Sequence, residues 1–277
     1  QTRKGKVFAA IHAHLDDIPY YCAGTCARLV EEGATGYIIR TTNDERCGPG
    51  TIMRNIKSNE TEHAKMAKSI GIADTFDFYY RNHDMNAISS LELRWRLITL
   101  FRHLKVDIVL TFNPWGHGEE NPDHWVTGRA VEEACWMAGM GNDYPEHRDA
   151  GLNPHSVTER YYFVGRPGQP YNRVVDIAPH IEKKIDSLVE CRAQGRGNSG
   201  SLLRARLAKE GKRLPILGSD DRTADREYVR AFMLNDEQRM GKKHGLKYAE
   251  CFYYIDQRGP SGKTPVEEYI EKNAVRV

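Results

Sequence analysis

The sequence predicts an α/β fold, in which a Rossmann-like, doubly wound and mostly parallel sheet carries helices on both faces. Two observations predict this fold. Short apolar runs of strand length alternate with longer segments whose apolar residues recur at helical spacing. Polar side chains able to bind a metal follow the first and the fourth of these runs. Strands that alternate with helices form a parallel sheet with right-handed crossovers, so that their carboxyl ends share one edge.

The expected elements follow from this alternation. Strands are expected from Val7 up to the first histidines and at residues 35–42, 75–80, 107–112, 160–164, 173–177 and 247–254. Helices are expected at residues 19–32, 58–70, 89–104, 125–138, 179–193 and 224–244. Gly33 and Gly71 are suited to end the first two helices, because glycine adopts the left-handed conformation common after a helix.

The length and composition favour one domain. The 277 residues show no repeat and no convincing linker, so one domain over residues 1–277 is expected, with an irregular excursion or lid around 194–223. The net charge of +2 gives no reason to expect nucleic acid as a partner. No apolar run approaches the ~18 residues of a membrane span. A soluble chain is therefore expected, and a start at Gln1 is compatible with export after removal of a signal peptide.

Two polar blocks are expected to meet at one edge of the sheet. His14, Asp16 and Asp17 come directly after the first strand, and Asp123 and His124 come after the fourth. The doubly wound order places these two strands side by side, with their carboxyl ends at the ligand crevice. Each residue alone is more often a helix cap, a surface charge or a satisfied core histidine. Their meeting at neighbouring strand ends favours a metal site.

Imidazole and carboxylate are the ligands that zinc prefers in proteins, and a catalytic zinc has three protein ligands and one open position. His14, Asp17 and His124 would supply such a set. Adjacent side chains point in different directions, so Asp16 would be free to act as general base on the attacking water. His12, two residues before His14 on the same strand face, is expected to be a buried hydrogen-bonding partner.

The motifs Ala13-His14-Leu15-Asp16-Asp17, followed by Gly24, and Pro122-Asp123-His124 resemble those of the LmbE-like (PIG-L) zinc-dependent N-deacetylases. That family, related to N-acetylglucosaminyl de-N-acetylase, carries an A-H-P-D-D-E block and an H-P-D-H block. The resemblance implies an LmbE-like fold and zinc held by His14, Asp17 and His124. It also implies that Asp16 is the general base and that Asp123 orients a neighbour. The expected reaction removes an N-acyl group, most simply acetyl, from an amino sugar or glycoconjugate.

The departures from these motifs concern catalysis and substrate. Leu15 replaces the usual Pro and Ile18 the usual Glu, and neither position touches the metal. Asn121 stands in place of the first histidine of H-P-D-H, which in the family helps to stabilise the oxyanion or to protonate the leaving amine. Asn121 can donate a hydrogen bond to an oxyanion but cannot act as an acid. We therefore expect Asp16, once protonated, or His117 to deliver the proton.

Substrate contacts are expected from four further residues. The arginine that the family places three residues before the glutamate of the second helix falls at Asn59, so a sugar contact would come from Arg46 or Arg54. Trp115 in the loop before Asp123 could stack on a sugar, and His83 follows the third strand near the same crevice.

Two alternative interpretations remain open at this point. The block His12-Ala13-His14-Leu15-Asp16-Asp17 also resembles that of metallo-β-lactamase-like hydrolases, in which, however, several strands precede the block. A non-catalytic or divergent metal-binding relative that binds carbohydrate is the other alternative. The replacement at Asn121 supports it, whereas the presence of Asp16 argues for a hydrolase. A homo-oligomer is compatible with the sequence.

Overall fold

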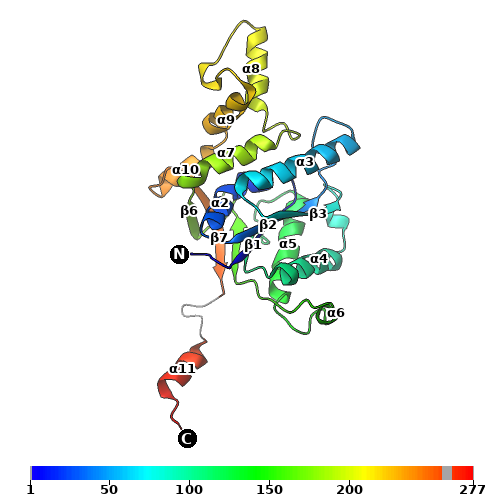
Figure 1. Ribbon diagram of the computed structural model, residues 1–277, viewed down its shortest axis with the longest axis vertical. Coiled ribbons are helices and arrows are strands. Elements are labelled where there is room, and N and C mark those ends of the chain that lie inside the picture. Colours follow the sequence, from blue (N-terminus) through cyan, green and yellow to red (C-terminus); the bar gives the residue numbers. More distant parts are fainter. Residues whose placement is uncertain (1, 258–263, 277) are drawn as a thin grey trace.

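The computed structural model describes residues 2–257 and 264–276 and has a seven-stranded sheet at its centre (Figure 1). The sheet order is β3-β2-β1-β4-β5-β7-β6. Its strands are β1 (Val7–His12), β2 (Thr35–Thr42), β3 (Asp74–Tyr80), β4 (Ile108–Thr111), β5 (Glu159–Phe163), β6 (Arg173–Asp176) and β7 (Ala249–Asp256). Among these strands, β7 alone runs in the opposite direction. It pairs antiparallel with β5 and with β6, whereas the other strand pairs are parallel. The predicted mostly parallel, doubly wound sheet is thus confirmed.

Helices cover both faces of the sheet, as Figure 1 shows. One layer contains α1 (Asp17–Tyr21), α2 (Ala23–Glu31), α3 (Ile52–Ile70) and α7 (Ile181–Glu190), and the other contains α4 (Ser90–Leu104) and α5 (Pro122–Met137). Successive side chains of β1 enter opposite layers of the core. Phe8 and Ala10 belong to the cluster under α2 and α7, whereas Ala9 and Ile11 belong to the cluster under α4 and α5. This alternation is the two-residue period of a strand that is buried on both faces.

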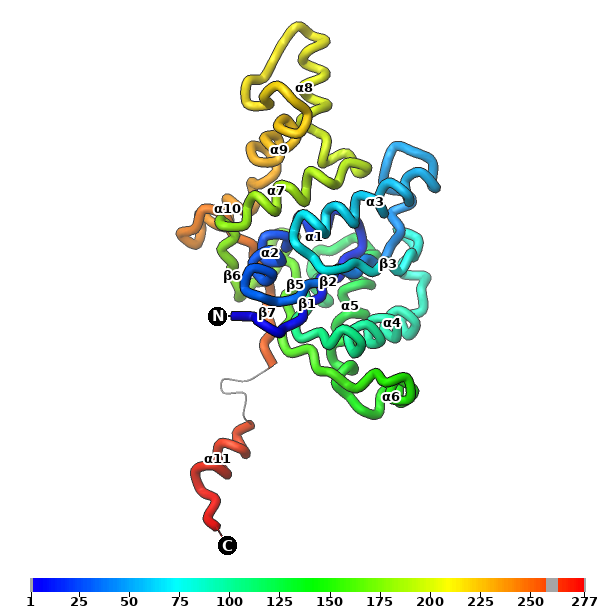
Figure 2. The backbone as a smooth tube through the Cα atoms, in the orientation of Figure 1, coloured from blue at the N-terminus to red at the C-terminus, as the bar shows by residue number. Residues whose placement is uncertain are grey.

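The remaining helices are shorter or peripheral. They are α6 (Glu146–Asp149), α8 (Ser199–Lys209), α9 (Asp221–Phe232), α10 (Asn235–Lys243) and α11 (Pro265–Asn273). Short 3₁₀ turns lie at Met85–Ala87, Ala178–His180 and Pro215–Leu217. In the tube view of Figure 2, α8 and α9 extend from the end of α7 away from the sheet. The region expected to be irregular at 194–223 therefore contains a regular helix.

Several boundaries differ from the sequence-based expectation for local reasons. The expected helix at 19–32 is two helices that meet at Cys22, whose φ of −152° is not helical. Helix α3 begins earlier than expected, at Ile52, because the Thr51 side chain accepts a hydrogen bond from the Arg54 amide and caps it. The expected helix at 224–244 is divided into α9 and α10.

The sheet order positions the functional residues. Strands β1 and β4 are paired in parallel, so the loops after them leave the same edge of the sheet. Helix α5 then packs closely on the end of β4. A Cβ atom at Gly128 would lie 2.8 Å from the Phe112 carbonyl oxygen, so a larger residue there would push α5 away. The first turn of α5 is in this way held beside the end of β1.

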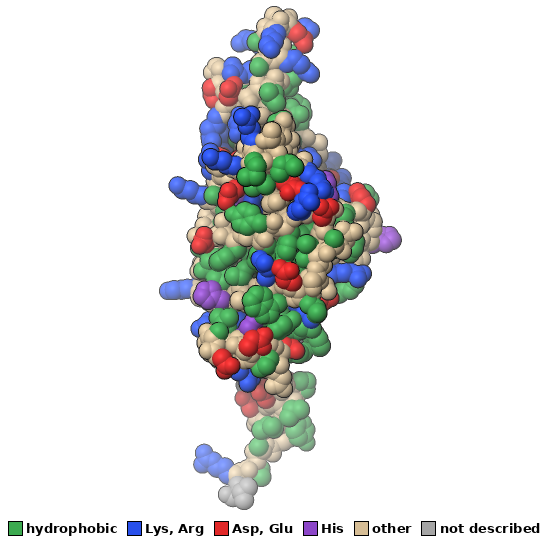
Figure 3. All heavy atoms as spheres, turned by 90° about the vertical axis from the view of Figure 1, so that its right-hand side faces the viewer, with side chains coloured by type: hydrophobic (Ala, Val, Ile, Leu, Met, Phe, Trp, Pro, Cys, Tyr) green, Lys and Arg blue, Asp and Glu red, His purple; other side chains and the backbone are tan. Residues whose placement is uncertain are grey.

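The surface carries charges of both signs. In Figure 3, Lys and Arg side chains are interspersed with Asp and Glu over the upper part of the molecule, where α8 and α9 lie. Ion pairs join Arg226 of α9 to Glu182 of α7, and Arg204 of α8 pairs with Asp221 of α9. No helix within residues 2–257 and 264–276 has both the length and the apolar character needed to cross a bilayer.

Candidate functional site

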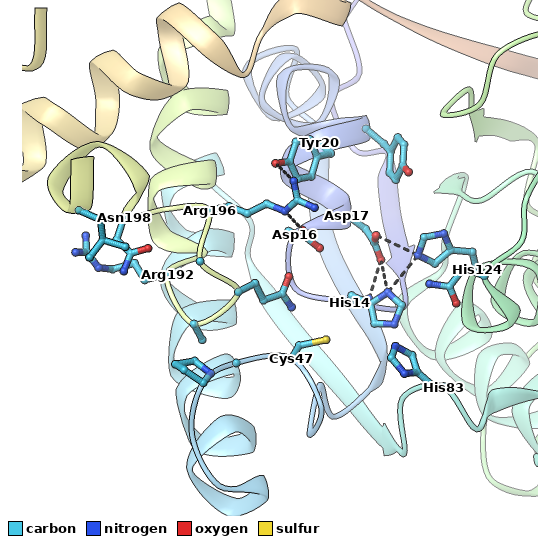
Figure 4. Close-up of a pocket in the computed structure, with 18 of the residues that line it drawn as sticks. His14, Asp16, Asp17, Tyr20, Cys47, His83, His124, Arg192, Arg196 and Asn198 are labelled. Carbon is cyan, nitrogen blue, oxygen red and sulfur yellow. Dashed lines mark hydrogen bonds and ion pairs between the residues drawn. The ribbon is translucent and has the colours of Figure 1, made fainter. Parts of the chain in front are cut away.

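His14, Asp17 and His124 converge at the carboxyl ends of β1 and β4 (Figure 4). His14 lies two residues beyond β1, Asp17 begins α1, and His124 lies in the first turn of α5. The backbone amides of Ala13 and His14 both donate to Asp17 Oδ2, at 3.1 and 2.7 Å. These two bonds fold the β1–α1 turn back on itself and aim the carboxylate at the histidines.

The distances between the three donor groups match a tetrahedral metal site. His14 Nδ1 lies 3.1 Å from His124 Nε2 and 3.7 Å from Asp17 Oδ2, and His124 Nε2 lies 3.4 Å from Asp17 Oδ1. Bonds of about 2.0–2.1 Å to a tetrahedral zinc place neighbouring ligand atoms roughly 3.3 Å apart. All three side chains are buried. The residues present therefore fit a small divalent cation.

The charges around His14 also favour a cation. Burial alone would lower the pKa of His14, but the hydrogen bond that its ring donates to Asp123 and the charges of Asp17 and Asp44 raise it to about 9. An imidazole surrounded by carboxylates marks a place where positive charge is stabilised. A metal ion would supply that charge where the two histidine nitrogens face each other.

Carboxylates lie beside the outer nitrogens of both histidines. Asp123 Oδ2 lies 3.0 Å from His14 Nε2, and Glu119 Oε2 lies 3.3 Å from His124 Nδ1. Such partners fix the tautomer and the ring orientation of a metal-binding histidine. Burial would raise the pKa of Glu119, but His124 and Arg166 lower it to about 2, so Glu119 is a carboxylate at neutral pH. Asp123 is predicted from the sequence as a residue that orients a neighbour. Glu119 lies in the same loop but was not among the predicted site residues.

A second group of side chains within the described residues is close enough to hold a metal: His14, His83 and Asp123. This group is less suited to do so. The Asp123 carboxylate already accepts from His14 Nε2 and from the backbone amides of His83 and Met85, at 2.6 and 3.3 Å for the amides. His83 is exposed, and its φ of +68° lies in the left-handed region. Asp123 is therefore engaged in orienting His14.

Asp16 lies beside the three residues, at the N-cap of α1, and does not join them. Arg196 Nε lies 3.1 Å from Asp16 Oδ2, and the Gln194 amide nitrogen, turned toward Asp16, donates to Oδ1 at 2.9 Å. Burial and the nearby charge of Asp17 raise the pKa of Asp16 to about 6, while Arg196 opposes this change. A carboxylate with such a pKa can both take and return a proton near neutral pH.

Buried polar residues support the β1–α1 turn from behind. His12 Nδ1 lies 2.6 Å from the His14 carbonyl oxygen, and His12 Nε2 lies 3.1 Å from His63 Nε2. Burial, with the charges of His63 and Arg40, lowers the pKa of His12 well below its ordinary value. Asp44, held by Arg40 at 3.0 Å, accepts a hydrogen bond from the Leu15 amide at 2.9 Å. His12 thus lies where the sequence analysis expected a supporting residue.

A cavity of about 700 Å³, the first cavity, opens over these residues. Its lining includes His14, Asp16, Asp17, His83, Asn121 and His124. Asn121 is the N-cap of α5, and its Oδ1 accepts from the Asp123 amide at 3.0 Å. The amide nitrogen of the Asn121 side chain is therefore the group that can donate to a ligand.

Four other candidates from the sequence lie outside this lining. Arg46 pairs with Asp84 at 3.1 Å, and Arg54 is exposed on α3. Trp115 is 58% exposed and packs edge-on against Tyr162. His117 is exposed on the loop before α5.

Residues from the loop after α7 line the first cavity instead, namely Arg192, Ala193, Gln194, Gly195 and Arg196. The sequence predicts a helix over residues 179–193 and an excursion or lid around 194–223, and it marks none of these five residues as functional. Arg196 also donates to the Tyr20 hydroxyl at 2.9 Å and lies over the Tyr20 ring, as Figure 4 shows. No motif or spacing marks such a contact, because it joins residues far apart in the chain.

Part of the chain is similar to a known protein family. Residues 9–135 match the family model described as PIG-L: GlcNAc-PI de-N-acetylase. Diacetylchitobiose deacetylase from Thermococcus kodakarensis is 28% identical over 190 residues, which cover 65% of this chain and 67% of that protein.

Solved structures show the same fold. N,N′-diacetylchitobiose deacetylase from Pyrococcus horikoshii aligns with a TM-score of 0.71 at 22% identity, covering 96% of this chain and 89% of that one. The 4-carboxy-2-hydroxymuconate hydratase GalB from Pseudomonas putida aligns with a TM-score of 0.68 at 18% identity, covering 94% and 100%. This fold therefore supports more than one reaction, and the site must decide the activity. Both polar blocks lie inside the matched region, so this part of the chain is similar to the PIG-L (LmbE-like) family.

Proposed function

We propose that this protein is a zinc-dependent N-deacetylase that removes an acetyl group from the nitrogen of an amino sugar or glycoconjugate. The observation that carries the proposal is the convergence of His14, Asp17 and His124, with Asp16 beside them in one cavity. The T. kodakarensis relative is named as a deacetylase of an N-acetylated disaccharide, and the matched family model is named for the same reaction type. The presence of Asp16, a carboxylate with a pKa of about 6, favours a hydrolase over a protein that only binds carbohydrate.

His14, Asp17 and His124 would hold the zinc, and zinc would polarise the amide carbonyl and make a nearby water more acidic. Asp16 accepts a proton from the attacking water as the water oxygen bonds to the carbonyl carbon. The Asn121 amide nitrogen donates to the oxyanion that forms. Asp16 then returns the proton to the amine nitrogen as the C–N bond breaks. The products are a carboxylate and a free amine.

The first test is the substitution Asp16→Asn. It keeps the shape of the side chain but removes the base, so amine release from N-acetylated amino sugars should fall at least about 10²-fold. Zinc content, measured by elemental analysis, should stay at the parent level because Asp16 is not a ligand. Asp149→Asn, on the exposed helix α6, is the matched control and should retain full turnover.

The possible outcomes separate the interpretations. Loss of turnover with zinc retained supports the hydrolase and the assignment of the base. Parent-level turnover in Asp16→Asn would remove Asp16 from the mechanism. A parent protein that holds no zinc and releases no amine from any N-acyl amino sugar would overturn the proposed function.

A further inference from the structure

A cavity of about 260 Å³, the α2 cavity, lies between α2 and the outer strands of the sheet. Its lining comes from the segment before β1, from the region of α2, and from β5 and β6, and the charged or hydroxyl-bearing side chains in it include Arg3, Arg28, Glu32, Tyr161 and Arg173. The volume lies below the range of about 300–1,000 Å³ that is usual for drug-sized ligands, so the α2 cavity suits a small ligand.

The charges in this lining are unequal, because three guanidinium groups surround one carboxylate. Arg28 Nε donates to Glu32 Oε1 at 2.9 Å, and the other Glu32 oxygen lies 3.7 Å from Arg3 Nε. Arg3 also pairs with Glu159, which is buried outside the lining. Both oxygens of Glu32 thus face arginines, and the cavity keeps a surplus of positive charge.

Arg173 supplies this surplus. Its guanidinium group lies over the Tyr254 ring, with 3.9 Å between Cζ and the ring centroid. No carboxylate within residues 2–257 and 264–276 forms an ion pair with it. A guanidinium group can stack on an aromatic face and still present the N–H groups at its edge to an oxyanion. Arg173 is therefore held in place without being neutralised.

Tyr161 adds a buried hydroxyl group to the same lining. The side chain is 5% exposed, and its ring packs against Tyr254 and Phe252 at centroid distances of 4.7 and 5.4 Å. Its hydroxyl makes no hydrogen bond with any residue that the structure describes, although buried polar groups are ordinarily satisfied. Burial and the charge of Glu159 raise the pKa of Tyr161 above its ordinary value, so this hydroxyl keeps its proton at neutral pH and can donate.

The side-chain groups left without partners in the α2 cavity can all donate hydrogen bonds. Arg28 uses its Nε for Glu32, and its two terminal nitrogens have no partner in the described part of the chain. Arginine has no acceptor atom, so a ligand that only accepts suits Arg28, Arg173 and Tyr161 together. An oxyanion accepts charge-assisted hydrogen bonds and also balances the positive charge, whereas a neutral ligand would leave that charge unbalanced.

We propose that the α2 cavity binds a small oxyanion of the size and charge of inorganic phosphate. Arg28 contacts the anion from α2 and Arg173 contacts it from β6, while the Tyr161 hydroxyl donates to it from β5. The bound ion joins α2 to two strands of the sheet. The site is independent of the proposed function, because none of the described residues lines both the α2 cavity and the first cavity.

Calorimetric titration of the zinc-loaded protein with inorganic phosphate tests the site, with the ionic strength held constant by sodium chloride. We expect the parent protein to bind phosphate with a Kd of about 1 mM or tighter. Tyr161→Phe keeps the ring and removes the donor, and Arg173→Gln removes the charge. Each substitution should weaken phosphate binding by about tenfold or more, the effect of losing one hydrogen bond to a charged group.

Arg206→Gln is the matched control, because Arg206 is an exposed arginine on α8 outside the α2 cavity. This variant should bind phosphate as the parent does. His124→Gln separates the α2 cavity from the zinc site, since phosphate bound to the metal would be lost in that variant and phosphate in the α2 cavity would remain. Circular dichroism checks that each variant is folded.

Glycerol 3-phosphate, titrated in parallel, distinguishes a free ion from the phosphate group of a larger molecule. An affinity similar to that of inorganic phosphate identifies a site open to phosphate esters, and a much weaker one identifies a site for the free ion. Both results support an oxyanion site. The inference is overturned if the parent binds no phosphate, if binding survives both Tyr161→Phe and Arg173→Gln, or if binding disappears in His124→Gln.

Discussion

His83 brings an imidazole to the cavity wall that Asn121 also lines. Its ring lies edge-on to His14, with 6.2 Å between the ring centroids. Its backbone amide binds Asp123, which in turn holds His14, so residue 83 is fixed relative to the site. A non-glycine residue held in the left-handed region is a conformation often found at functional sites. The family motif has a histidine where this chain has Asn121. We therefore expect the His83 imidazole to donate a hydrogen bond to the oxyanion beside the Asn121 amide, in place of that histidine.

Substituting His83 by Asn tests this role. Asn tolerates the left-handed conformation but shortens the side chain and removes the imidazole. We expect kcat/KM for amine release to fall about 10²-fold, as for the loss of one donor to an oxyanion. Zinc content should not change. His117→Ala is the comparison, because His117 lies outside the cavity lining, and it should keep the parent pH–rate profile. A larger loss of kcat/KM in His117→Ala than in His83→Asn would contradict the role of His83 and favour His117 as the group that delivers the proton.

Single residues differ in how far the sequence reveals them. His14, Asp17 and His124 could be placed together because parallel strand order brings the ends of β1 and β4 to one edge. Arg196 and Gln194 could not, because their contacts with Asp16 depend on the path of the loop after α7. Trp115 is a different case. Its position in the loop predicts a sugar contact, and in the structure it lies outside the lining of the first cavity with its ring edge-on to Tyr162 on β5.

At the scale of elements, one buried ion pair joins three helices and a strand behind the site. Lys184 of α7 is fully buried and binds Glu250 of β7 at 2.9 Å and the Tyr20 carbonyl oxygen of α1 at 2.6 Å. Glu250 also accepts from the Gly24 and Thr25 amides at the start of α2. The negative charge lies at the positive end of the α2 dipole. These contacts fix α1, which carries Asp17, against the sheet.

We expect Lys184→Met to destabilise the fold by roughly 3–5 kcal/mol, because removing one partner leaves buried carboxylates without a counter-charge. Urea denaturation at pH 7 measures this loss. Lys183→Met, on the exposed side of the same helix, should change stability little. An equal effect of the two substitutions would contradict the role of Lys184.

The pH dependence of this effect has a defined sign. Burial would lower the pKa of Lys184, but the charges of Glu237 and Glu250 raise it above its ordinary value. The stabilisation by Lys184 is therefore complete below the unfolded-state pKa of about 10.4 and is lost as the pH rises through the folded-state value. In the parent protein it should be constant between pH 6 and 9.

The elements themselves were largely predictable, whereas their arrangement in the second half was not. A short apolar run locates β2 at residues 35–42, which is buried along most of its length, and helical spacing locates α4 within 89–104, which buries one face. Strand β7 inserts between β5 and β6 and runs antiparallel to both. No local pattern encodes this pairing, since it depends on contacts between residues far apart in the chain. A cavity of about 760 Å³ lies at this junction and was therefore invisible in the sequence.

At the scale of the whole molecule, the site joins segments from most of the chain. The first cavity takes residues from the loops after β1, β2, β3 and β4, and from the loop after α7. Folding brings His14 and His124 together across 110 positions. The unfolded chain holds no such set of donors, so zinc should bind the folded state almost exclusively. Zinc affinity and global stability are consequently linked.

Zinc removal should therefore lower the thermal midpoint of unfolding. Free zinc at about 100 times its Kd contributes about 2.7 kcal/mol to the folded state. Each kcal/mol corresponds to roughly 2–4 °C for a chain of about this size. Dialysis against a chelator should thus lower the midpoint by several degrees, and added zinc should restore it. His124→Gln removes one ligand and should abolish most of the zinc response, whereas His103→Gln, at an exposed position on α4, should keep it. If His124→Gln responds to zinc as the parent does, the stabilising ion binds elsewhere, and the assignment of His14, Asp17 and His124 as its ligands fails.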